Sequence, residues 1–547
     1  MSEPEVLIVG AGPTGLTLAC GLLANGVAAR VVDKAVEPAG TSRALGLQPR
    51  GIEVVERLGA LNGLPQRALQ VEEIVVHING KQAASVRVGQ RTALVTRPGL
   101  VISQADVEVE LRRRVGELGG QIEWGSEVAA AEQDSHGVTV RLADGGQSRA
   151  GWLVGCDGAH SRVRQLAGVG FPGAPLAERF LLVDVHADLP LSRNSIYVWL
   201  DGESVFGAFP LPGEDLWRLM APTADPGTDA DLVTDEAALA EVARLLGERT
   251  GCDPSLIGDP EWVTSFRVQR RLAETYRNGR ILLAGDAAHV HSPFGGQGMN
   301  TGIGDAENLA WKLAMVVNAT AEPELLDSYE AERRPIAASL LKSTGAAGNL
   351  ILGNHILARL VRDRVIIPLM NNASMQRRVW ENLSQLKVSY RNGPLGRQAR
   401  RKWSSVRGPL PGDRVPDLEC VRVVGGEQTT LHAELGNKWA LVMPGRTASD
   451  EYAAVVAKRL ADGGMITLVA DHESNLVMPG RTVSDEYTAV VAERLGDDGM
   501  ITLVADHHSN GEIMLVRPDA HLGWRGRADP DALDRWLIAV ARLGRAG

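Results

Sequence analysis

Three glycines near the N-terminus have the spacing of a phosphate-binding turn. The motif GAGPTG follows an apolar run and supplies Gly10, Gly12, Pro13, Thr14 and Gly15. In a G-x-G-x-x-G motif the first glycine makes a tight turn, the second lets a pyrophosphate approach the backbone, and the third lets helix and strand pack closely. Unpaired N–H groups at the start of the following helix would face the phosphates. The chemistry is dinucleotide binding, and the motif alone does not distinguish FAD from NAD.

An acidic residue closes the same stretch of sequence. Leucines recur at helical intervals after Gly15, and Val31-Val32 indicates a second strand that ends at Asp33. Asp33 lies 18 positions after Gly15, where a carboxylate can accept hydrogen bonds from ribose hydroxyls. A glycine-rich turn can be a plain connection, but strand, helix and acid stand here in the required order. We therefore predict a dinucleotide site at this βαβ unit.

Two later strands also run into a polar turn that contains an aspartate. The apolar run 152–155 leads to Asp157, and the run 281–284 leads to Asp286. Polar groups at the carboxyl ends of parallel strands lie at the sheet edge where α/β proteins bind ligands. Alternatively, Asp157 is a simple turn residue.

A further glycine-rich stretch, from Pro293 to Asn300, precedes an expected helix. Its glycines allow the backbone to approach a planar ligand closely, and the apolar pattern from about Asn300 is helical. The N-terminus of that helix would point to Gly298 and Met299, where it can stabilise negative charge on a ligand. Alternatively, Met299 and Asn300 are ordinary residues at the start of a helix.

Three polar residues between these motifs have two interpretations each. Arg43 and Arg50 bracket the segment after Asp33. Either both are helix-end cations, or Arg43 contacts a pyrophosphate and Arg50 is an active-site residue. Gln104 lies in the first turn of a helix predicted over 103–118, where a surface glutamine is the simpler interpretation. We identify no catalytic acid or base and no metal site.

Length and composition describe an ordinary globular protein. The 547 residues correspond to roughly three domains, and 44% hydrophobic and 23% charged residues are usual values. The net charge of −10 argues against nucleic acid and anionic membranes as partners. No apolar run reaches about 18 residues, and the first strand begins too early for a signal peptide. The cysteines form no C-x-x-C pair, which excludes disulfide-reductase chemistry and favours the cytoplasm.

The expected elements divide the chain into three domains and a linker. Residues 1–170 and 276–390 form a discontinuous dinucleotide-binding domain with a helical extension. Residues 171–275 read as short strands and one helix, which predicts an antiparallel-sheet domain with one face over a pocket. The basic, Gly/Pro-rich segment 391–416 predicts a linker, and residues 417–547 form a small α/β domain.

The C-terminal domain contains a tandem duplication. Residues 441–475 and 476–510 are two copies of 35 residues that are identical at 29 positions. Each copy predicts a strand, a helix and a strand. Two copies are too few for a solenoid, so we interpret them as a recent duplication of one βαβ unit. An extra unit held loosely at a sheet edge would leave the rest of the domain intact.

Taken together, the glycine-rich blocks resemble the group A FAD-dependent aromatic monooxygenases, which have the p-hydroxybenzoate hydroxylase fold. The blocks are GAGPTG, CDGAHSRVR and GDAAHVHSPFGGQGMNTGIGDAENLAWKL. The segment TSRALGLQPRGIEVVERLG, the middle sheet and the C-terminal domain resemble the aromatic polyketide hydroxylase branch. The resemblance implies an α/β fold: a Rossmann-like FAD-binding domain, an inserted antiparallel-sheet substrate domain and a C-terminal thioredoxin-like domain that lacks redox cysteines.

By position, the resemblance implies one set of contacts with the adenosine and pyrophosphate of FAD. The loop from Gly10 to Gly15 would hold the pyrophosphate, and Asp33 the adenosine ribose, with Lys34 beside it. Arg43 and Gln104 match positions that contact the dinucleotide in the family.

A second implied set lies at the flavin end. Asp157 would support both FAD and nicotinamide binding. Asp286 would be a buried carboxylate that binds the ribityl or pyrophosphate part of FAD. Pro293 and the run Gly298-Met299-Asn300 would lie against the isoalloxazine ring.

The resemblance finally implies a reaction. A single glycine motif provides one permanent site, for non-covalent FAD, so NAD(P)H would be a transient reductant, with NADPH favoured over NADH. A flavin C4a-hydroperoxide formed with O2 would hydroxylate a polycyclic aromatic, polyketide-type substrate. Two alternatives stay open: Baeyer–Villiger oxygenation of a related polycyclic ketone or quinone, and a flavin-containing drug-binding protein without turnover. We expect a monomer or homodimer.

Overall fold

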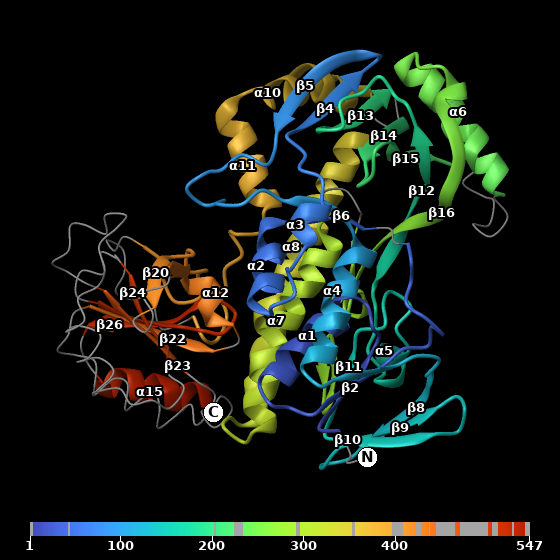
Figure 1. Cartoon of the computed structure of the whole chain (residues 1–547). Coiled ribbons are helices and arrows are strands. Elements are labelled where there is room, and N and C mark those ends of the chain that lie inside the picture. The colour runs from blue at the N-terminus through green and yellow to red at the C-terminus, as the bar shows by residue number, and fades with distance from the viewer. Residues whose placement is uncertain are drawn as a thin grey trace.

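The computed structural model of the chain shows three parts, which Figure 1 colours from blue at the N-terminus to red at the C-terminus. The first domain and the sheet domain are stacked, and the C-terminal domain lies beside the first. The structure describes residues 4–41, 44–201, 204–223, 234–291, 296–352, 356–396, 408–422, 428–436, 438–444, 465–470, 501–505, 512–527 and 530–541.

The first domain is built on a six-stranded sheet in the order β17-β18-β11-β1-β2-β7. Strand β1 (Val6–Val9) pairs in parallel with β2 (Ala29–Val32) and with β11 (Trp152–Gly155). Strand β18 (Ile281–Leu283) continues the parallel order beside β11, and β7 (Gln121–Glu123) continues it beside β2. The carboxyl ends of β1, β11 and β18 therefore meet at one edge of the sheet, as the sequence predicts.

Helices cover this sheet because their apolar faces match its buried strands. The N-terminal helix α1 (Pro13–Ala24) contacts α4 (Gln104–Glu117) and the long α7 (Gly298–Val317), whose residues from Met299 to Leu313 are largely buried. The remaining elements of the domain and its extension are β3 (Leu45–Leu47), α2 (Pro49–Arg57), α3 (Leu64–Arg67), β6 (Leu100–Ser103), β8 (Val128–Gln133), β9 (Val138–Leu142), β10 (Gln147–Ala150), α5 (Arg162–Leu166), β17 (Arg277–Asn278), η3 (Gly285–Ala287), η4 (Pro323–Leu326), α8 (Asp327–Leu352), α9 (Ile356–Val361), the π-helix η5 (Arg362–Ile366), α10 (Ile367–Leu369) and α11 (Ala373–Leu383).

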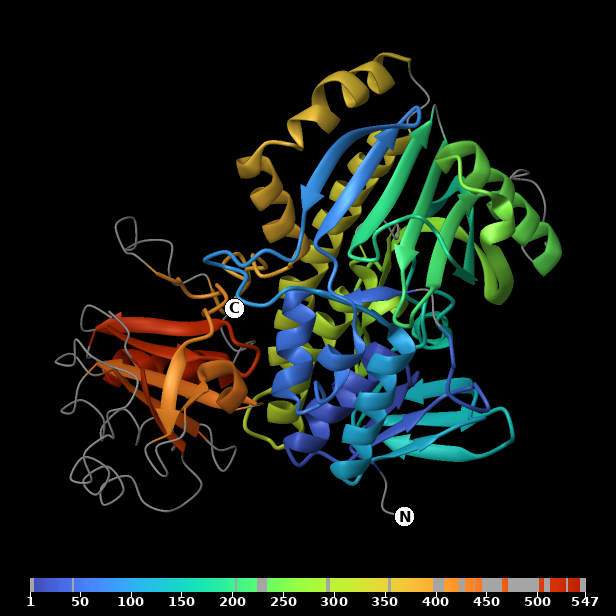
Figure 2. The ribbon, with the colours of Figure 1, turned by 45° about the horizontal axis from the view of Figure 1, so that its top comes forward.

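The second domain is an eight-stranded sheet in the order β19-β16-β12-β15-β14-β13-β4-β5. Its members are β4 (Glu73–Ile78), β5 (Lys81–Arg87), β12 (Gly173–Ala187), β13 (Ser195–Asp201), β14 (Ser204–Pro210), β15 (Leu216–Pro222), β16 (Ile257–Leu272) and β19 (His289–Val290). The boundary predicted at 171–275 is therefore too narrow, because the β4–β5 hairpin belongs to this sheet (Figure 2). The hairpin turns at Asn79 and Gly80, whose φ values of 49° and 75° suit a primed turn.

The two faces of this sheet differ. One face packs its apolar side chains against α6 (Asp235–Thr250), through residues such as Val183 and Val242. The other carries Phe180 with the partly buried Trp262 and Phe266, and Ile367 of α10 packs in the same cluster. A face with incompletely covered aromatic side chains suits a wall of a pocket for an apolar ring system.

The C-terminal domain contains a seven-stranded sheet in the order β21-β20-β24-β23-β22-β25-β26. Strands β23 (Met465–Ala470) and β24 (Ile501–Ala505) are the same strand of the two sequence copies. They pair in parallel, and each residue pairs with its own duplicate, from Ile466 with Ile501 to Ala470 with Ala505. Both strands are internal, so the condition considered above, a copy held at the sheet edge, is not met by these strands. The other parts expected for the second copy lie outside the described residues.

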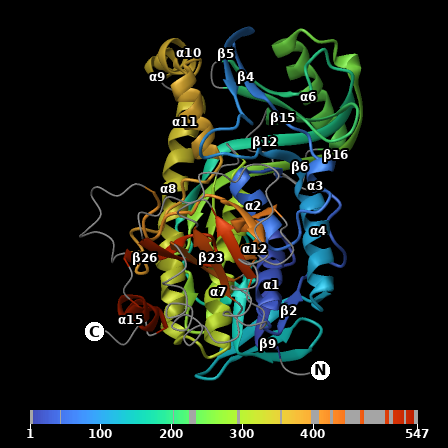
Figure 3. The ribbon, with the colours of Figure 1, turned by 60° about the vertical axis from the view of Figure 1, so that its left-hand side comes forward.

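The other described elements of this domain are β20 (Glu419–Arg422), β21 (Gln428–Thr430), α12 (Leu431–Leu435), β22 (Trp439–Pro444), β25 (Glu512–Val516), β26 (Leu522–Arg527) and α15 (Pro530–Ala541). The domain lies against α2 and α7 (Figure 3). Its Trp439 meets Trp311 of α7 edge to face, with ring centroids 5.3 Å apart. Within the described residues, no helix is long and apolar enough to cross a bilayer.

The segment predicted as a linker is packed where the structure describes it. Leu395 and Val415 are buried, Gly412 donates its N–H to the Leu522 carbonyl, and Arg414 forms an ion pair with Glu53 of α2. The basic residues and turns that suggested a free connection thus serve in part as an interdomain contact.

Candidate functional site

The glycine-rich turn after β1 has the three geometries that its spacing predicts. Gly10 has a φ of +108°, and a Cβ there would lie 2.4 Å from the Cys156 carbonyl oxygen. A Cβ at Gly15 would lie 2.0 Å from the Gly10 carbonyl oxygen, whereas a Cβ at Gly12 would meet nothing within 4 Å. The first and third glycines therefore allow close packing, and the second leaves space in front of α1.

Two other blocks, far apart in sequence, meet the same turn. Thr14, at the start of α1, lies where a Cβ on Gly285 or on Gly302 would come within 2.5 Å of its Oγ1. Gly285 opens the η3 turn that carries Asp286, and Gly302 belongs to the first turns of α7. The structure thus brings together GAGPTG, the turn after β11, the turn after β18 and the start of α7.

The Asp33 carboxylate supports the glycine-rich turn itself. One oxygen accepts the Ala11 N–H at 2.7 Å and the other the Ala35 N–H at 2.8 Å. Asp33 remains half-buried and Lys34 is exposed, so both stay accessible beside the turn.

A second carboxylate, Glu108, lies near Asp33 and escaped the sequence analysis. Gln104 donates its Nε2–H to Glu108 at 2.8 Å, one helical turn further along α4. Burial raises the pKa of Glu108, Asp33 adds to the effect, and Gln104 with Arg112 opposes it. The i, i+4 spacing from Gln104 is the signal that could have identified it.

Asp157 acts locally as a helix cap. Its Oδ1 accepts from the Ser161 hydroxyl at 2.5 Å, and its Oδ2 accepts the N–H groups of Arg162 and Val163 at the start of α5. Within the chain, Asp157 therefore makes the contacts expected of a turn residue. A capped and oriented carboxylate at the end of β11 still borders the shared edge.

Asp286 differs from expectation because its side chain is exposed, whereas we expected a buried carboxylate. The reason is its place in η3, which carries it beyond the end of β18 and out of the core. Exposure at this edge keeps it accessible to a ligand.

The start of α7 is held by an amide side chain. Asn300 is buried, accepts the Gln48 N–H at 2.8 Å, and donates to the carbonyls of Gly46 and Gly296, both at 3.1 Å. Met299 is also buried, and Gly298 is the first residue of the helix. Asn300 therefore orients the α7 N-terminus. Arg43 and Pro293 lie outside the described residues.

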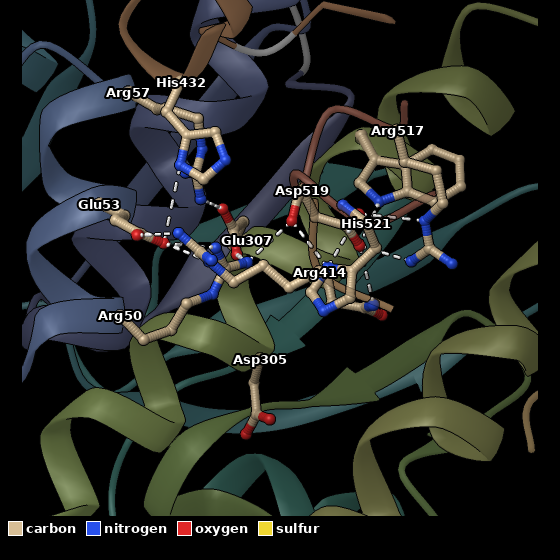
Figure 4. Close-up of polar contacts among 12 residues, drawn as sticks. Arg50, Glu53, Arg57, Asp305, Glu307, Arg414, His432, Arg517, Asp519 and His521 are labelled. Atoms are coloured by element: carbon tan, nitrogen blue, oxygen red, sulfur yellow. Dashed lines mark hydrogen bonds and ion pairs between the residues drawn. The ribbon is translucent and has the colours of Figure 1, made fainter. Parts of the chain in front are cut away.

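Arg50 is not placed for catalysis, and the active-site role considered for it needs correction. Its guanidinium is buried and binds Glu53, Glu307 and the Asp519 carbonyl oxygen, with the last two at 2.6 and 2.8 Å. Figure 4 shows it inside a cluster of side chains from α2, α7 and the C-terminal domain. A helix-end arginine at this position instead joins two domains.

A buried carboxylate on α7, Asp305, was also missed by the sequence analysis. Its oxygens contact Gly285 N, His289 Nε2 and Arg333 Nε at 3.1, 2.6 and 2.6 Å. Burial opposes its ionisation, but Arg333 and His289 outweigh this and hold the pKa of Asp305 below its ordinary value. The sequence places Asp305 on the helix predicted from about Asn300, but it gives no signal of the residues that Asp305 contacts.

These features fit a bound dinucleotide. The N-cap of α1 is Gly12, which has no side chain to compete for the first N–H groups of the helix, and the space in front of it is open. The carboxylates of Asp33 and Glu108 can accept hydrogen bonds from sugar hydroxyls. Within the described residues no group of side chains could hold a metal ion.

Comparison with known proteins agrees with this geometry. A family model described as an FAD binding domain matches residues 3–344. The chain is 36% identical over 482 residues to 6-methylpretetramide 4-monooxygenase of Streptomyces rimosus, covering 86% of this chain and 84% of that protein. It is 37% identical over 409 residues to a rifampicin monooxygenase of Streptomyces venezuelae, covering 72% and 82%.

Solved structures extend the similarity to the C-terminal domain. The OxyS anhydrotetracycline hydroxylase of Streptomyces rimosus superimposes with a TM-score of 0.72 at 30% identity, covering 98% of each chain. A ternary complex of aklavinone-11 hydroxylase with FAD and aklavinone gives a TM-score of 0.75 at 25% identity and covers 98% of this chain and 99% of that one.

Proposed function

We propose that this chain, which belongs to the FAD-binding family of flavoprotein monooxygenases, hydroxylates a polycyclic aromatic, polyketide-type compound with NADPH as the reductant. The observation that carries the proposal is that the three glycine-rich blocks meet at one sheet edge, in a domain stacked against a sheet that carries aromatic side chains on one face. The similarity to the tetracycline and aklavinone hydroxylases supports a substrate with several fused rings.

We assign the residues in two groups. The loop from Gly10 to Gly15 and the start of α1 bind the pyrophosphate, and Asp33 and Lys34 bind the adenosine ribose with Gln104. Asp286, Pro293, Gly298, Met299 and Asn300 would hold the flavin end, and Asp157 would support both FAD and nicotinamide binding. Arg43 contacts the pyrophosphate.

The protein supplies orientation and charge, and the flavin supplies oxygen activation when bound. The N-terminus of α7, which Asn300 holds in place, would supply N–H groups that stabilise negative charge on the ring. We also propose that hydroxylation proceeds through the flavin C4a-hydroperoxide. The C-terminal domain would have a thioredoxin-like fold. The aromatic face with Trp262 and Phe266 covers the substrate and excludes water from it.

The test is ligand-stimulated oxidation of NADPH and NADH by the purified protein with a panel of tetracyclic and angucyclic phenols. We expect faster NADPH oxidation and a product heavier by one oxygen atom derived from O2. A ring-opened product would indicate that the reaction is Baeyer–Villiger oxygenation and not hydroxylation. Absence of stimulation, with flavin bound and compounds shown to bind, would contradict turnover.

A simpler measurement tests the mode of flavin attachment. No histidine or cysteine lies in a recognisable attachment context, so acid precipitation should release the yellow flavin into the supernatant. Flavin that stays with the precipitated polypeptide would contradict a non-covalent site.

A further inference from the structure

Asp305 is a fully buried carboxylate that connects three elements around the flavin site. Its side chain is 0% exposed on α7. Its Oδ2 accepts the Gly285 N–H at 3.1 Å and contacts His289 Nε2 at 2.6 Å, and its Oδ1 accepts from Arg333 Nε at 2.6 Å. One residue thus holds η3, β19 and α8 against α7.

The Gly285 N–H is the important donor because Gly285 directly precedes Asp286. Gly285 has a φ of +62°, a left-handed conformation that favours glycine. Backbone bonds hold the turn at its carbonyl side, where Gly285 accepts the Ala288 N–H at 2.8 Å. The bond from the Gly285 N–H to Asp305 adds a side-chain restraint from α7, directly before Asp286, which the turn presents to the sheet edge.

Arg333 extends this support to the first turns of α7. Its Nη2 donates to the Thr301 carbonyl at 3.0 Å and its Nη1 to the Tyr390 hydroxyl at 3.0 Å. The Tyr390 ring lies 4.1 Å from the His521 ring and 5.2 Å from the Arg517 guanidinium, both in the C-terminal domain. The support of the turn is therefore continuous with the interdomain contact.

Asp305 is separate from the ion cluster on the other side of the same helix. Figure 4 shows it pointing away from Glu307, which binds Arg50 and Arg57. Because the two carboxylates serve different neighbours, they can be altered independently.

We propose that Asp305 is a positioning residue of the flavin site, which holds the Gly285–Ala287 turn against α7 so that Asp286 meets FAD in one geometry. This inference rests on the proposed function for the assignment of Asp286. Asp305 acts through the turn and does not itself contact the cofactor.

An asparagine cannot reproduce these contacts. Three N–H donors converge on the two oxygens of Asp305, and an amide offers one oxygen and one NH2 group. If the amide oxygen faces Gly285, the NH2 group faces the Arg333 Nε–H, and the opposite orientation sets it against the Gly285 N–H. Asp305→Asn therefore keeps the volume of the side chain but breaks one arm of the support.

The experiment compares Asp305→Asn with Glu332→Gln in the full chain. Glu332 is equally buried, at 0% side-chain exposure, and binds Lys312 and Arg517 without a contact to the turn. The dissociation constant of FAD is measured by flavin fluorescence, and the unfolding temperature is measured with and without FAD. Reduction of bound flavin by NADPH is measured at saturating FAD.

We expect Asp305→Asn to raise the Kd for FAD about tenfold or more and to shrink the increase in unfolding temperature that FAD produces. Glu332→Gln should lower the unfolding temperature equally with and without FAD and leave the Kd within about threefold. An unchanged Kd and an unchanged FAD-induced shift in Asp305→Asn would overturn the proposal.

If Asp305→Asn is insoluble, Arg333→Lys decides the question. A lysine keeps the charge beside Asp305 but cannot reach both Asp305 and the Thr301 carbonyl, so the Kd for FAD should rise about threefold or more. A wild-type Kd would again overturn the proposal. The comparison needs no substrate, so failure of the substrate panel with normal FAD binding would contradict the proposed function alone.

Discussion

Single residues at the sheet edge differ in what their polar atoms contact and in how exposed they are. Asp157 and Asn300 use their polar atoms on the chain itself, on the start of α5 and on the loop before α2. Asp33 does both, because it fixes Ala11 and is still half-buried at the surface. Asp286 is exposed at the edge and is the residue whose side chain we expect to meet the cofactor most directly.

Replacing Asp286 by alanine should weaken FAD binding without unfolding the protein. One lost hydrogen bond contributes about 1 kcal/mol, so the Kd for FAD should rise about fivefold or more. Fluorescence titration measures it, with Asp188→Ala, an exposed aspartate of the sheet domain, as the control. Equal affinity of the two variants would count against Asp286 as a flavin contact.

Replacing Arg50 by methionine should destabilise the protein but spare its chemistry. The substitution leaves Glu307 with Arg57 and Glu53 with Arg414, yet removes a buried cation between two domains. Breaking a buried pair costs about 3 kcal/mol, measurable by urea unfolding.

The control for Arg50 is Arg244→Met, which breaks the two ion pairs that this exposed arginine makes with Glu241 and Glu248 on α6 and should leave stability nearly unchanged. The rate of flavin reduction per bound FAD should match wild type in both variants. A large loss of that rate in Arg50→Met at full FAD occupancy would restore an active-site role.

At the scale of elements, the duplication has placed two nearly identical strands side by side. Strand β24 lies between β23 and β20, and β20 pairs with the residues from Leu503 to Ala505. The same residue types occur in β23 from Leu468 to Ala470. If β24 were absent, β23 would offer β20 the same sequence of residues to pair with.

Deleting residues 476–510 should therefore give a folded domain with one strand fewer. The joined sequence keeps β25, and the deleted residues come well after the glycine-rich blocks in the sequence. We expect a soluble protein with wild-type flavin content and NADPH oxidation, measured by absorbance and by substrate-stimulated turnover. Because β24 is internal, we expect no gain in stability. An insoluble or flavin-free product would show that the second copy is essential to the core.

At the scale of the whole molecule, the C-terminal domain is docked through buried charges and neutral histidines. Burial lowers the pKa of both His432 and His521, which outweighs the attraction of nearby carboxylates. For Glu332, burial alone would raise the pKa, but Arg517 and Lys312 lower it to about 2. Both kinds of group make the docked state sensitive to acid.

We expect the free energy of unfolding to fall in two steps as the pH decreases. A histidine with a lowered folded-state pKa binds its proton mainly in the unfolded state, so stability falls below pH 6.5, by about 1.4 kcal/mol per pH unit for each histidine. Glu332 contributes stability above its unfolded pKa near 4.5, and this is lost as the pH falls toward 2.

Urea unfolding followed by tryptophan fluorescence measures the first step between pH 7.5 and 5. The variants His432→Gln and His521→Gln should flatten the profile, while His136→Gln, which alters an exposed histidine, should not. A stability that stays constant over this range would contradict buried neutral histidines at the interface.

The sequence by itself determined the local conformations and the order of the blocks. The spacing of Gly10, Gly12 and Gly15, the apolar runs before Asp157 and Asp286, and the helical pattern after Asn300 all depend on backbone conformation and side-chain periodicity, which neighbouring residues set. The hairpin at Asn79-Gly80 is predictable for the same reason. So is the α/β class of the chain.

Only the tertiary structure decided which buried charges meet. Arg50 and Arg414 pair with acids hundreds of positions away in sequence, the β4–β5 hairpin joins the sheet domain, and Asp305 receives donors from three elements. Such contacts depend on how whole elements dock, and an isolated arginine or aspartate in a helix carries no local signal of its partner. For that reason the sequence located the sheet edge where the glycine-rich blocks meet, whereas the residues that hold that edge in place emerged only from the fold.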